Sequence, residues 1–588
     1  MPTLDWIGKA AVVDHHRKVP YRLLRCDREL STGNADAGNL LVQGDNLLAL
    51  KALLPYYAGK VKCIYIDPPY NTGNENWVYN DNVNSPEIRK WLNQVVGKEG
   101  EDLSRHDKWL CMMYPRLALL KEFLADDGVI LCHIDEHSLH YLLILLEELF
   151  GRSNILGHIV WDKRNPKGDA QGISYQHESL VLFAREKEKF LNSSKLMRRK
   201  ANAERIVQKG KELFEKIGTD YIPDDQAKCI KKYKLSKEIV VPWQRKRTLE
   251  SINVEFAQWI KEQRDISQGE AAYRMIDDNG DVFRLVSMAW PNKKTAPDEY
   301  FIPLIHPKTK KPCPVPVRGW RNPPDTMKLL LERNEIIFGD DESIQPQRKY
   351  LLRKNLFENM PSLFSYGASD DALFRIMELS FENPKPYQFC LQLIGILTQD
   401  NDIIRDSFAG SGTTAHAVLA QNAADGGNRR FILVEMDENI CRNVTAQRVR
   451  KAIYGYNNTS GLGGGFRYCK LGGELFDAMG NVSGEVRFSD LAAHVYFTET
   501  GSPLPKRSTG KSPLLGVYRD RAVYLLYNGI LGDRRVDGGN VLTHEIALAL
   551  PPHNGMRVVY GEACRLGKKS LERYNIVFRQ IPYALKVD

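Results

Sequence analysis

The chain has 588 residues, of which 43% are hydrophobic and 10% aromatic. This composition excludes a mainly disordered chain, and the length predicts roughly three or four domains. Lys and Arg number 82 against 73 Asp and Glu, a formal net charge of +9. The excess is modest for this size and hints at an acidic partner, depending on whether it is spread or clustered.

The ten cysteines form no C-x-x-C pair, and several lie in apolar runs, as Cys63 and Cys132 do. Such usage is typical of free thiols in a reducing compartment. The N-terminus lacks a basic stretch followed by an apolar one, and no segment reaches about 18 consecutive apolar residues. We therefore expect a soluble cytoplasmic protein with free cysteines and no membrane span.

The first part of the chain alternates short apolar runs with helical patterns. Residues 1 to about 30 are expected to be a partly ordered lead-in. Over 31–185 the alternation predicts a mostly parallel sheet with helices on both faces. Strands are expected at 39–45, 63–67, 128–135, 159–161 and 180–183, and helices at 46–54, 108–124 and 138–150.

The pattern then changes and later resumes. Residues 186–370 begin polar and basic, continue rich in Pro, Gly and Trp, and are expected to be an insert. Over 371–470 we expect helices at 388–397, 413–422 and 438–453, and strands at 403–406 and 431–435. A glycine-rich linker at 461–465 precedes a C-terminal α+β domain at 471–588. The fold class is thus α/β, interrupted by an insert.

A glycine-rich turn, Asp406-Ser-Phe-Ala-Gly-Ser-Gly-Thr-Thr414, lies between a predicted strand and a predicted helix. Glycines let a backbone approach a ligand, and the helix start offers free N–H groups. Glu435 ends the next strand, 23 residues after Gly412, where nucleoside-binding folds place an acid for the ribose hydroxyls. No Lys follows Gly412, which argues against a P-loop. A nicotinamide cofactor, S-adenosylmethionine and a plain structural turn remain open.

A second motif, Asp67-Pro-Pro-Tyr70, directly follows an apolar strand. Two prolines remove two backbone donors, so carbonyl acceptors remain beside the Asp67 carboxylate. Such a corner suits an exocyclic NH₂ group, and Tyr70 offers a flat face for a planar base. The alternative is a polyproline strand stop before a turn at 71–73.

Together the two motifs indicate one reaction. Ligands of doubly wound sheets bind outside the carboxyl ends of the strands. A nucleoside cradle beside an amine-holding corner predicts direct methyl transfer from a sulfonium to an amino nitrogen. Positioning, without a covalent enzyme intermediate, supplies most of the barrier reduction.

These residues resemble the motifs of S-adenosylmethionine-dependent DNA amino-methyltransferases, in which D-P-P-Y is catalytic and F-x-G-x-G binds the cofactor. The catalytic motif comes first, a long insert follows, and the cofactor motif comes last. This order resembles the beta class, whose circularly permuted Rossmann-like sheet is interrupted by a target-recognition domain. Asp rather than Ser at position 67 is similar to adenine-N6 enzymes rather than cytosine-N4 enzymes.

The resemblance implies roles for particular residues. Asp67 and the Pro68 carbonyl would accept hydrogen bonds from N6, and Tyr70 would stack on the extruded base. The implied catalytic set is Asp67, Pro68, Pro69 and Tyr70. The implied S-adenosylmethionine contacts are Asp45, Phe381, Lys385, Asp406, Phe408, Gly410, Gly412, Thr413 and Glu435. No metal is expected.

The insert is the expected DNA-binding element. Residues 185–250 hold 19 Lys or Arg and 10 Asp or Glu, with interleaved aromatics. Phosphate neutralisation and base readout need such a mixture, although a solvated helical face has the same appearance. The expected contacts are Arg198, Arg199, Lys231, Lys232, Arg245, Arg247, Arg318 and Arg321, with Trp320 beside the last two.

Segments 154–161 and 176–180 resemble the modification subunits of type III restriction–modification systems. This implies site-specific methylation of double-stranded DNA by base flipping, in a restriction–modification or phage-defence system. A homodimer and a helicase–nuclease restriction subunit are open as partners. The alternatives are cytosine-N4 methylation, a subunit that mainly recognises DNA for a helicase–nuclease complex, and a nicotinamide enzyme.

Overall fold

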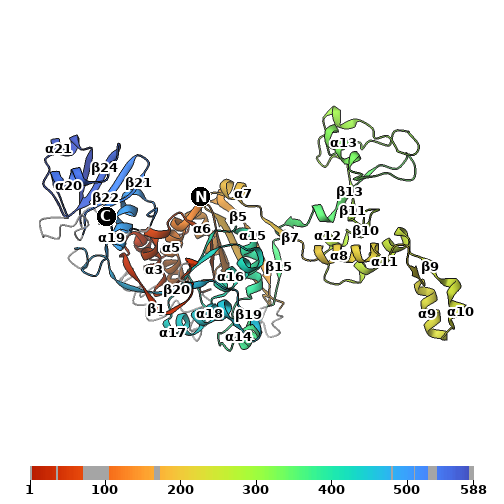
Figure 1. The fold of residues 1–588 in the computed structure, drawn as a ribbon, viewed down its shortest axis with the longest axis horizontal. Coiled ribbons are helices and arrows are strands. Elements are labelled where there is room, and N and C mark those ends of the chain that lie inside the picture. The colour runs from red at the N-terminus through yellow and green to blue at the C-terminus, as the bar shows by residue number, and fades with distance from the viewer. Residues whose placement is uncertain are drawn as a thin grey trace. The chain divides into compact units, whose positions relative to one another are not determined.

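The computed structural model describes residues 3–34, 37–70, 105–164, 173–367, 369–477, 481–506, 508, 510–527 and 540–581 (Figure 1). The chain divides into two compact units, which are treated separately below. One unit comprises Met1–Leu196 and Pro361–Asp588, and the other comprises Met197–Met360.

The larger unit is built on a ten-stranded sheet with the order β1-β20-β2-β17-β16-β3-β4-β6-β5-β15. The six consecutive strands from β20 to β4 are parallel to one another. β1 and β6 are antiparallel to theirs, and β15 is parallel to β5. The sheet is thus mostly parallel, as predicted. Its strands are β1 Arg22–Gly33, β2 Leu40–Gln43, β3 Val61–Ile66, β4 Leu124–Ile134, β5 Ile155–Asp162, β6 His177–Ala184, β15 Leu363–Ser365, β16 Ile403–Asp406, β17 Arg430–Glu435 and β20 Gly465–Glu474.

Helices cover both faces of this sheet (Figure 1). One group is α3 (Asn46–Tyr57), α5 (Arg105–Phe123) and α6 (Leu139–Phe150), and the other is α15 (Tyr387–Leu397), α16 (Thr413–Asp425) and α18 (Ala446–Tyr454). Successive side chains of a strand point to opposite faces. In β3, Ile64 and Ile66 join the core formed with α3 and α5, whereas Tyr65 meets His133, whose ring contacts Phe389 of α15. Burial on both faces explains why these strands are continuous apolar runs.

The N-terminal segment is part of the fold, which corrects the expectation of a partly ordered lead-in over residues 1–30. Two short helices, α1 (Lys9–Val12) and α2 (His15–Lys18), contact α5, and Trp6 and Val12 belong to the main core. β1 forms the edge of the sheet against β20. An edge strand buries few of its side chains, so its sequence lacks a clear apolar run.

The glycine-rich segment 461–465 is also placed differently from the expected linker. It leads directly into β20, which pairs with both β1 and β2. A Cβ on Gly465 would lie 2.2 Å from the backbone nitrogen of Asn34, so glycine is needed for close chain contact. The expected boundary at 470/471 therefore falls inside a strand of the main sheet.

Pairing of β1 with β20 also places Cys26 opposite Cys469, and the two form a disulfide. This corrects the expectation that every cysteine is a free thiol. The two residues are 443 positions apart, so only the register of two distant strands brings them together. The described free cysteines are Cys63, Cys111, Cys132, Cys229, Cys313, Cys390, Cys441 and Cys564.

The insert is shorter in the structure than the expected 186–370. α7 (Lys187–Ser193) packs on β4, and β15 completes the main sheet, so both ends belong to the larger unit. The insert's core joins α8 (Ala203–Phe214), α11 (Leu249–Glu262) and the sheet β10-β11-β13-β12. Its strands are β10 Met275–Ile276, β11 Val282–Ser287, β12 Ile336–Ile337 and β13 Gln347–Leu351. Further elements are β7 Met197–Arg199, β8 Asp220–Tyr221, α9 Asp224–Tyr233, α10 Lys237–Val240, β9 Arg245–Lys246, α12 Gln268–Ala271, α13 Pro324–Glu332 and β14 Phe357–Asn359.

The C-terminal part belongs to the same compact unit as the main sheet. Its own sheet has the order β21-β22-β24-β26, in which β22, β24 and β26 are parallel. Helices alternate with these strands, so the arrangement is of the α/β kind rather than the expected α+β kind. The elements are α19 Phe488–Thr500, β21 Leu514–Tyr518, β22 Arg521–Leu525, β23 Val541–Leu542, α20 His544–Ala549, β24 Met556–Gly561, β25 Ala563–Cys564, α21 Lys568–Arg573 and β26 Ile576–Gln580.

Among the described residues, no helix has both the length and the apolar character needed to cross a membrane.

Candidate active site

The two sequence motifs meet at one edge of the main sheet. β3 and β16 are parallel neighbours, with Ile404 opposite Cys63. Their carboxyl ends therefore lie together, and Asp67 follows one strand while Asp406 ends the other. The chain thus brings together residues more than 300 positions apart, at the edge where doubly wound folds bind ligands.

The backbone of the D-P-P-Y corner is held from one side. The Trp109 indole donates to the Pro69 carbonyl at 2.6 Å, and the Ser138 hydroxyl donates to the Tyr70 carbonyl at 3.0 Å. Among the described residues, none donates to the Pro68 carbonyl. The corner is therefore anchored through two carbonyls, while a third remains available as an acceptor beside Asp67.

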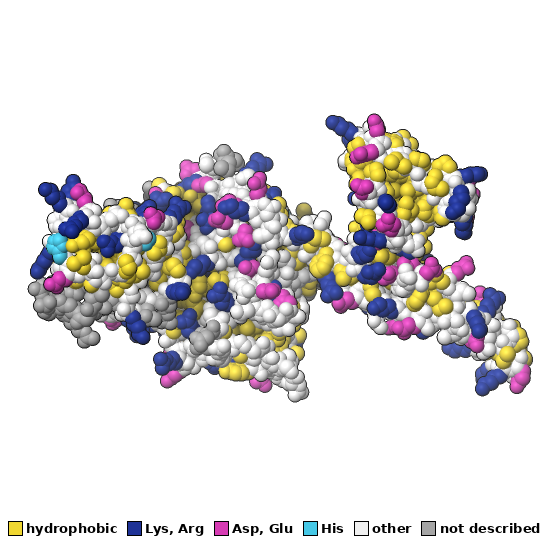
Figure 2. Space-filling model, turned by 45° about the horizontal axis from the view of Figure 1, so that its top comes forward, with side chains coloured by type: hydrophobic (Ala, Val, Ile, Leu, Met, Phe, Trp, Pro, Cys, Tyr) yellow, Lys and Arg dark blue, Asp and Glu magenta, His cyan; other side chains and the backbone are white. Residues whose placement is uncertain are grey.

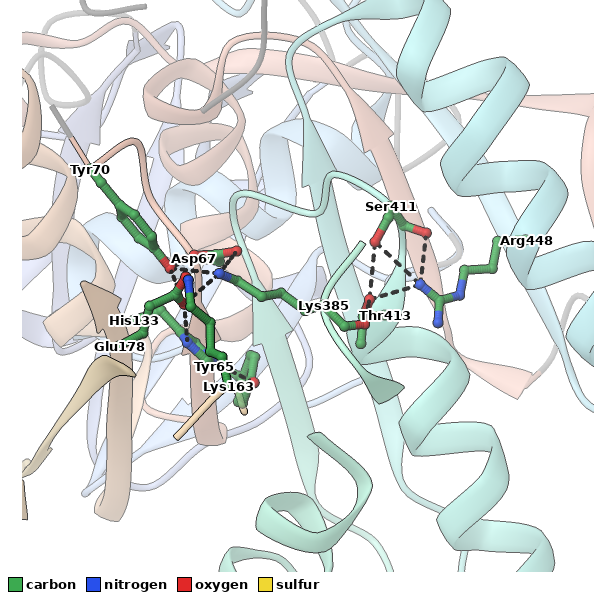
Figure 3. A network of polar contacts seen from close by, with 10 residues as sticks. All are labelled: Tyr65, Asp67, Tyr70, His133, Lys163, Glu178, Lys385, Ser411, Thr413 and Arg448. Carbon is green, nitrogen blue, oxygen red and sulfur yellow. Dashed lines mark hydrogen bonds and ion pairs between the residues drawn. The ribbon is translucent and has the colours of Figure 1, made fainter. Parts of the chain in front are cut away.

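Charged side chains converge on the corner (Figure 3). The Tyr70 hydroxyl donates to Asp67 Oδ1 at 2.5 Å and lies 3.1 Å from Glu178 Oε2. Lys385 Nζ lies 2.7 Å from Glu178 Oε2, 2.8 Å from the Tyr70 hydroxyl and 3.4 Å from Asp67 Oδ2. Lys163 Nζ contacts the other Glu178 oxygen at 2.8 Å. The result is a buried network of two ammonium groups, two carboxylates and one phenol.

Burial and charge pairing act in opposite directions within this network. Burial would raise the pKa of Glu178, but the ammonium groups of Lys385 and Lys163 outweigh it and lower that pKa to about 2. Burial would lower the pKa of Lys385, but Asp67 and Glu178 outweigh it and raise that pKa. Both groups are therefore charged at neutral pH. Burial, reinforced by the same carboxylates, raises the pKa of Tyr70 well above its usual value, which keeps the phenol protonated.

Beneath the network lies a buried neutral pair from the neighbouring strands β3 and β4. The Tyr65 hydroxyl lies 2.6 Å from His133 Nε2. Burial lowers the pKa of His133 to about 4. His133 therefore adds no positive charge at neutral pH.

The glycine-rich turn is built around the Asp406 carboxylate. It accepts the backbone N–H of Phe408 at 2.9 Å and the Thr414 hydroxyl at 2.6 Å. Burial raises the pKa of Asp406 to about 7. Gly410 and Gly412 have φ values of +48° and +76°, and Gly412 begins α16. These left-handed conformations explain the two glycines.

A π-helical turn, Cys441–Thr445, supports the glycine-rich turn from behind. It follows α17 (Glu438–Ile440) and interrupts the single helix expected over 438–453. The Thr445 hydroxyl donates to the Gly410 carbonyl at 2.6 Å. Arg448, in the helix that follows, is fully buried and donates to the Thr413 hydroxyl at 2.7 Å (Figure 3). Inserted turns of this kind often shape functional sites.

Glu435 lies at the end of β17 and is only 1% exposed. Its two carboxylate oxygens accept the backbone N–H groups of Gly410 and Asp437 at 2.9 and 2.8 Å. Burial raises the pKa of Glu435 to about 8. The acid expected to hold ribose hydroxyls therefore also fixes the glycine-rich turn.

Lys385 connects the two halves of the site. It is expected to contact a cofactor, but the structure places its ammonium group in the catalytic corner, while its backbone carbonyl accepts the Thr413 hydroxyl at 3.2 Å. Phe381 is half-buried near Phe374, with ring centres 6.3 Å apart. The aromatic ring of Phe408 packs against the main core.

Asp45 lies next to this region, at the start of α3. Its side chain accepts the Leu48 backbone N–H at 2.9 Å and forms an ion pair with Arg116 at 3.3 Å. It therefore caps a helix, whatever else it binds.

Comparison with known proteins now bears on this geometry. A family profile described as "DNA methylase" matches residues 61–447, which include both motifs and the insert between them. The chain belongs to this family.

The chain resembles proteins that are named as parts of restriction systems. It is 32% identical over 454 residues to the type III restriction–modification enzyme EcoP15I Mod subunit of Escherichia coli, covering 74% of this chain and 64% of that one. It is 26% identical to the StyLTI Mod subunit of Salmonella typhimurium, covering 77% and 60%. The chain therefore spans somewhat less than two thirds of these relatives. A solved PvuII DNA methyltransferase, described as cytosine-N4-specific, has a TM-score of 0.31 and 11% identity over 71% of this chain and 87% of that one.

The expected DNA-contacting residues fall into two groups within the insert. Arg198, Arg199 and Arg247 already form ion pairs, with Glu358, Glu204 and Glu255 respectively. The others are exposed: Lys231, Lys232, Arg245, Arg318 and Arg321. Figure 2 shows dark-blue Lys and Arg side chains at the tip formed by α9 and α10. The expectation that Trp320 lies with the DNA contacts is wrong. Its side chain is 2% exposed and donates to the Ile302 carbonyl, so Trp320 is a core residue.

Sequence reasoning missed four residues of this candidate site. Glu178 and Lys163 form the network under Tyr70, and Arg448 and Thr445 support the glycine-rich turn. The sequence does contain a sign of Glu178, because an acid two residues before the apolar run 180–183 must find a partner once it is buried. The other three are polar positions in ordinary surroundings, and only the packing reveals them.

Proposed function

We propose that this chain is a site-specific DNA methyltransferase that transfers a methyl group from S-adenosylmethionine to N6 of adenine in double-stranded DNA. One observation carries the proposal. The Asp67 carboxylate and the Pro68 carbonyl belong to consecutive residues that directly follow β3, and the neighbouring strand β16 leads into the glycine-rich turn. These two acceptors match the two hydrogens of an exocyclic amine.

The residues around the glycine-rich turn fit S-adenosylmethionine. A Cβ on Gly412 would approach Thr445 to 3.3 Å, so the turn is kept free of side chains at that point. The start of α16 offers backbone N–H groups, and Glu435 offers carboxylate oxygens for hydroxyls. Phe408, Gly410, Gly412, Thr413, Glu435, Phe381, Asp406 and Asp45 would hold the cofactor. When bound, it supplies an electrophilic methyl group on a sulfonium.

The corner then orients the amine for attack. Asp67 and the Pro68 carbonyl accept its two hydrogens and direct the nitrogen lone pair away from themselves. The Tyr70 hydroxyl and the Lys385 ammonium fix the carboxylate of Asp67, so its position does not depend on substrate. Holding the reacting groups in place is the main source of rate enhancement in such a transfer.

Tyr70 is proposed to stack on the extruded adenine. It is 8% exposed, and Lys385 Nζ lies 4.9 Å from its ring centre. The ammonium group is also hydrogen-bonded to the Tyr70 hydroxyl at 2.8 Å, so it lies at the hydroxyl end of the ring and leaves the ring faces to a base. A tyrosine held by its hydroxyl is a rigid platform for a base.

The insert is proposed to bind DNA. Residues 197–360 contain 32 Lys or Arg and 24 Asp or Glu, a formal excess of eight, so this unit holds nearly all the net charge of the chain. A cationic surface neutralises phosphates and supports site recognition. Because the matched relatives are named type III Mod subunits, we extend to this chain a place in a restriction–modification or phage-defence system of the cytoplasm. A helicase–nuclease subunit and a second copy of the chain are its proposed partners.

The test uses the full chain, DNA and S-adenosylmethionine with a labelled methyl group. We expect label in N6-methyladenine after digestion of the DNA to nucleosides. Asp67→Asn should reduce incorporation at least about 100-fold, because it removes the carboxylate that holds the amine. Cofactor affinity, measured by titration, should be retained.

Asp135→Asn, at the end of the neighbouring strand, is the matched control and should retain most of the activity. Label in N4-methylcytosine would overturn the base assignment. Full activity of Asp67→Asn would overturn the role of the corner.

A further inference from the structure

A cavity of about 440 Å³ lies at the opposite edge of the main sheet from the D-P-P-Y corner. Its lining includes Leu40 and Arg430, which begin β2 and β17, whereas the corner follows the carboxyl end of β3. Tyr57, at the end of α3, and Arg467 of β20 complete its polar wall. None of these residues belongs to the proposed methyl-transfer site.

Two arginines, Arg430 and Arg467, line the cavity together with Tyr57. Burial raises the pKa of Tyr57, and the positive charges of Arg467, Arg430 and Arg405 act against that rise. Among the described residues, no carboxylate forms an ion pair with any of the three.

Arg405 is the most unusual of the three, because it is 0% exposed in the middle of β16. Its guanidinium lies 4.0 Å from the ring centre of Phe123, and Nε donates to the Ser407 hydroxyl at 3.2 Å. Its two terminal nitrogens have no hydrogen-bond partner within the described structure. Nε of Arg467 is likewise buried without a partner.

Arg430 and Arg467 are half-buried and line the cavity, and neither forms an ion pair among the described residues, so both are available to an external anion. Partial burial removes part of their hydration, which an anionic ligand would replace. Asp490 is the one acid among the described residues that line the cavity, and it is paired with Arg25 at 3.2 Å. The cluster therefore keeps an uncompensated positive charge.

We propose that this cavity binds a phosphate-bearing ligand of nucleotide size, with its phosphate between Arg430 and Arg467 beside Tyr57. Arginine recognises phosphate oxygens through paired N–H donors. The volume exceeds what a free phosphate needs and lies in the range of small-molecule sites. Most of the other lining residues are apolar or aromatic and suit a base, among them Leu40, Leu53, Tyr56, Ala493 and Leu504.

An adjoining cavity of about 610 Å³ gives this site a cationic approach. It shares Leu24, Arg467 and Asp490 with the first cavity and adds Arg28 and Arg487 to the lining. Arginines along an entrance raise the local concentration of anions. The proposal does not depend on methyl transfer.

The test is calorimetric titration of the full chain with AMP, inorganic phosphate and adenosine. Saturating S-adenosylhomocysteine is present to block the proposed cofactor site. We expect one AMP per chain, weaker binding of phosphate and no binding of adenosine. Arg430→Gln with Arg467→Gln should weaken AMP binding at least about tenfold, because two charged donors are lost. Arg22→Gln, on the same β1–β20 edge but paired with Glu474, should bind AMP normally.

Several results would decide against the proposal. Absence of AMP binding, equal binding of adenosine, or unchanged AMP affinity in the double variant would each overturn it. Phosphate binding as tightly as AMP would support the arginine cluster but overturn the nucleotide size of the ligand. If the double variant does not fold, as judged by circular dichroism, Arg430→Lys replaces it and should weaken AMP binding without abolishing it. Methylation activity of the wild type and of each variant is measured in parallel. Its absence from all of them would contradict the proposed methyl transfer but not the proposed phosphate site.

Discussion

Lys385 joins the D-P-P-Y corner to the glycine-rich turn, through its side chain on one side and its backbone carbonyl on the other. Its ammonium group holds Tyr70, Glu178 and Asp67, and its carbonyl accepts the Thr413 hydroxyl. The sequence motif around it suggests a cofactor contact, whereas its geometry indicates a residue that positions the catalytic corner. The two roles make different kinetic predictions.

Replacing Lys385 with Met should lower the rate of methyl transfer about 100-fold, because Asp67 and Tyr70 lose their common partner. Cofactor affinity should change little, and Lys385→Arg should restore part of the rate. Single-turnover methylation and cofactor titration measure the two effects separately. Lys189→Met, which removes an exposed ion pair with Asp126, is the control. A large loss of cofactor affinity with a normal rate would instead support the cofactor role.

Glu435 should make stability depend on pH. Burial raises its pKa in the folded state to about 8, above the ordinary 4.5. Between these values the folded protein keeps the proton and the unfolded chain has released it, so stability falls as pH rises and levels off above about 8. Glu435→Gln removes this dependence. Between pH 5 and 8, the free energy of unfolding of the wild type minus that of the variant should fall by at most about 4 kcal/mol.

Urea unfolding of both proteins across that pH range measures the difference. Titration of Asp406 and other groups common to both proteins cancels in the comparison. Parallel curves would show that Glu435 does not keep a proton in the folded state.

At the scale of elements, α16 offers a matched pair of glycines at its two ends. Gly412 and Gly426 have nearly the same positive φ, +76° and +73°. A Cβ on Gly412 would crowd Thr445, whereas a Cβ on Gly426 would meet nothing within 4 Å. Both alanine variants should lose about 1 kcal/mol of stability through backbone strain.

Only Gly412→Ala should also weaken cofactor binding, by about tenfold or more, because it displaces the turn that approaches the ligand. Thermal unfolding and cofactor titration of the two variants test this. Equal cofactor affinity in both variants would mean that the turn is only structural.

Elements also show where sequence patterns stop being informative. The strands β3 and β16 and the helix α16 were predicted within a few residues, because they are buried apolar runs flanked by distinctive turns. β1 was missed, because an edge strand shows one weak face. The π turn at Cys441–Thr445 was missed as well, since one extra residue in a helix barely changes the apolar periodicity.

At the scale of the whole molecule, the net charge is concentrated in the insert. Its expected DNA contacts are not equivalent, because Arg198 forms an ion pair with Glu358, whereas Lys231 and Lys232 are exposed and have no ion pair among the described residues. Lys231→Gln with Lys232→Gln should weaken DNA binding and reduce its salt dependence by about one or two counterions.

Arg198→Gln should change the salt dependence less and instead lower the stability of the insert, because Glu358 loses its partner. Fluorescence anisotropy with labelled duplex DNA at several salt concentrations measures both variants. An unchanged salt slope in the lysine variant would remove α9 from the DNA interface, while cofactor affinity should stay constant throughout.

The sequence by itself determined the local features of this protein. Apolar periodicity defined the main strands and helices, and the residue types of the D-P-P-Y corner and the glycine-rich turn indicated their chemistry. Tertiary structure alone decided which distant residues meet: Cys26 with Cys469, Glu178 and Lys163 with Lys385, and Arg430 and Arg467 with Tyr57. The physical reason is that local patterns arise from the geometry of one element. Contacts between elements depend on strand order and register, which no short stretch of sequence encodes.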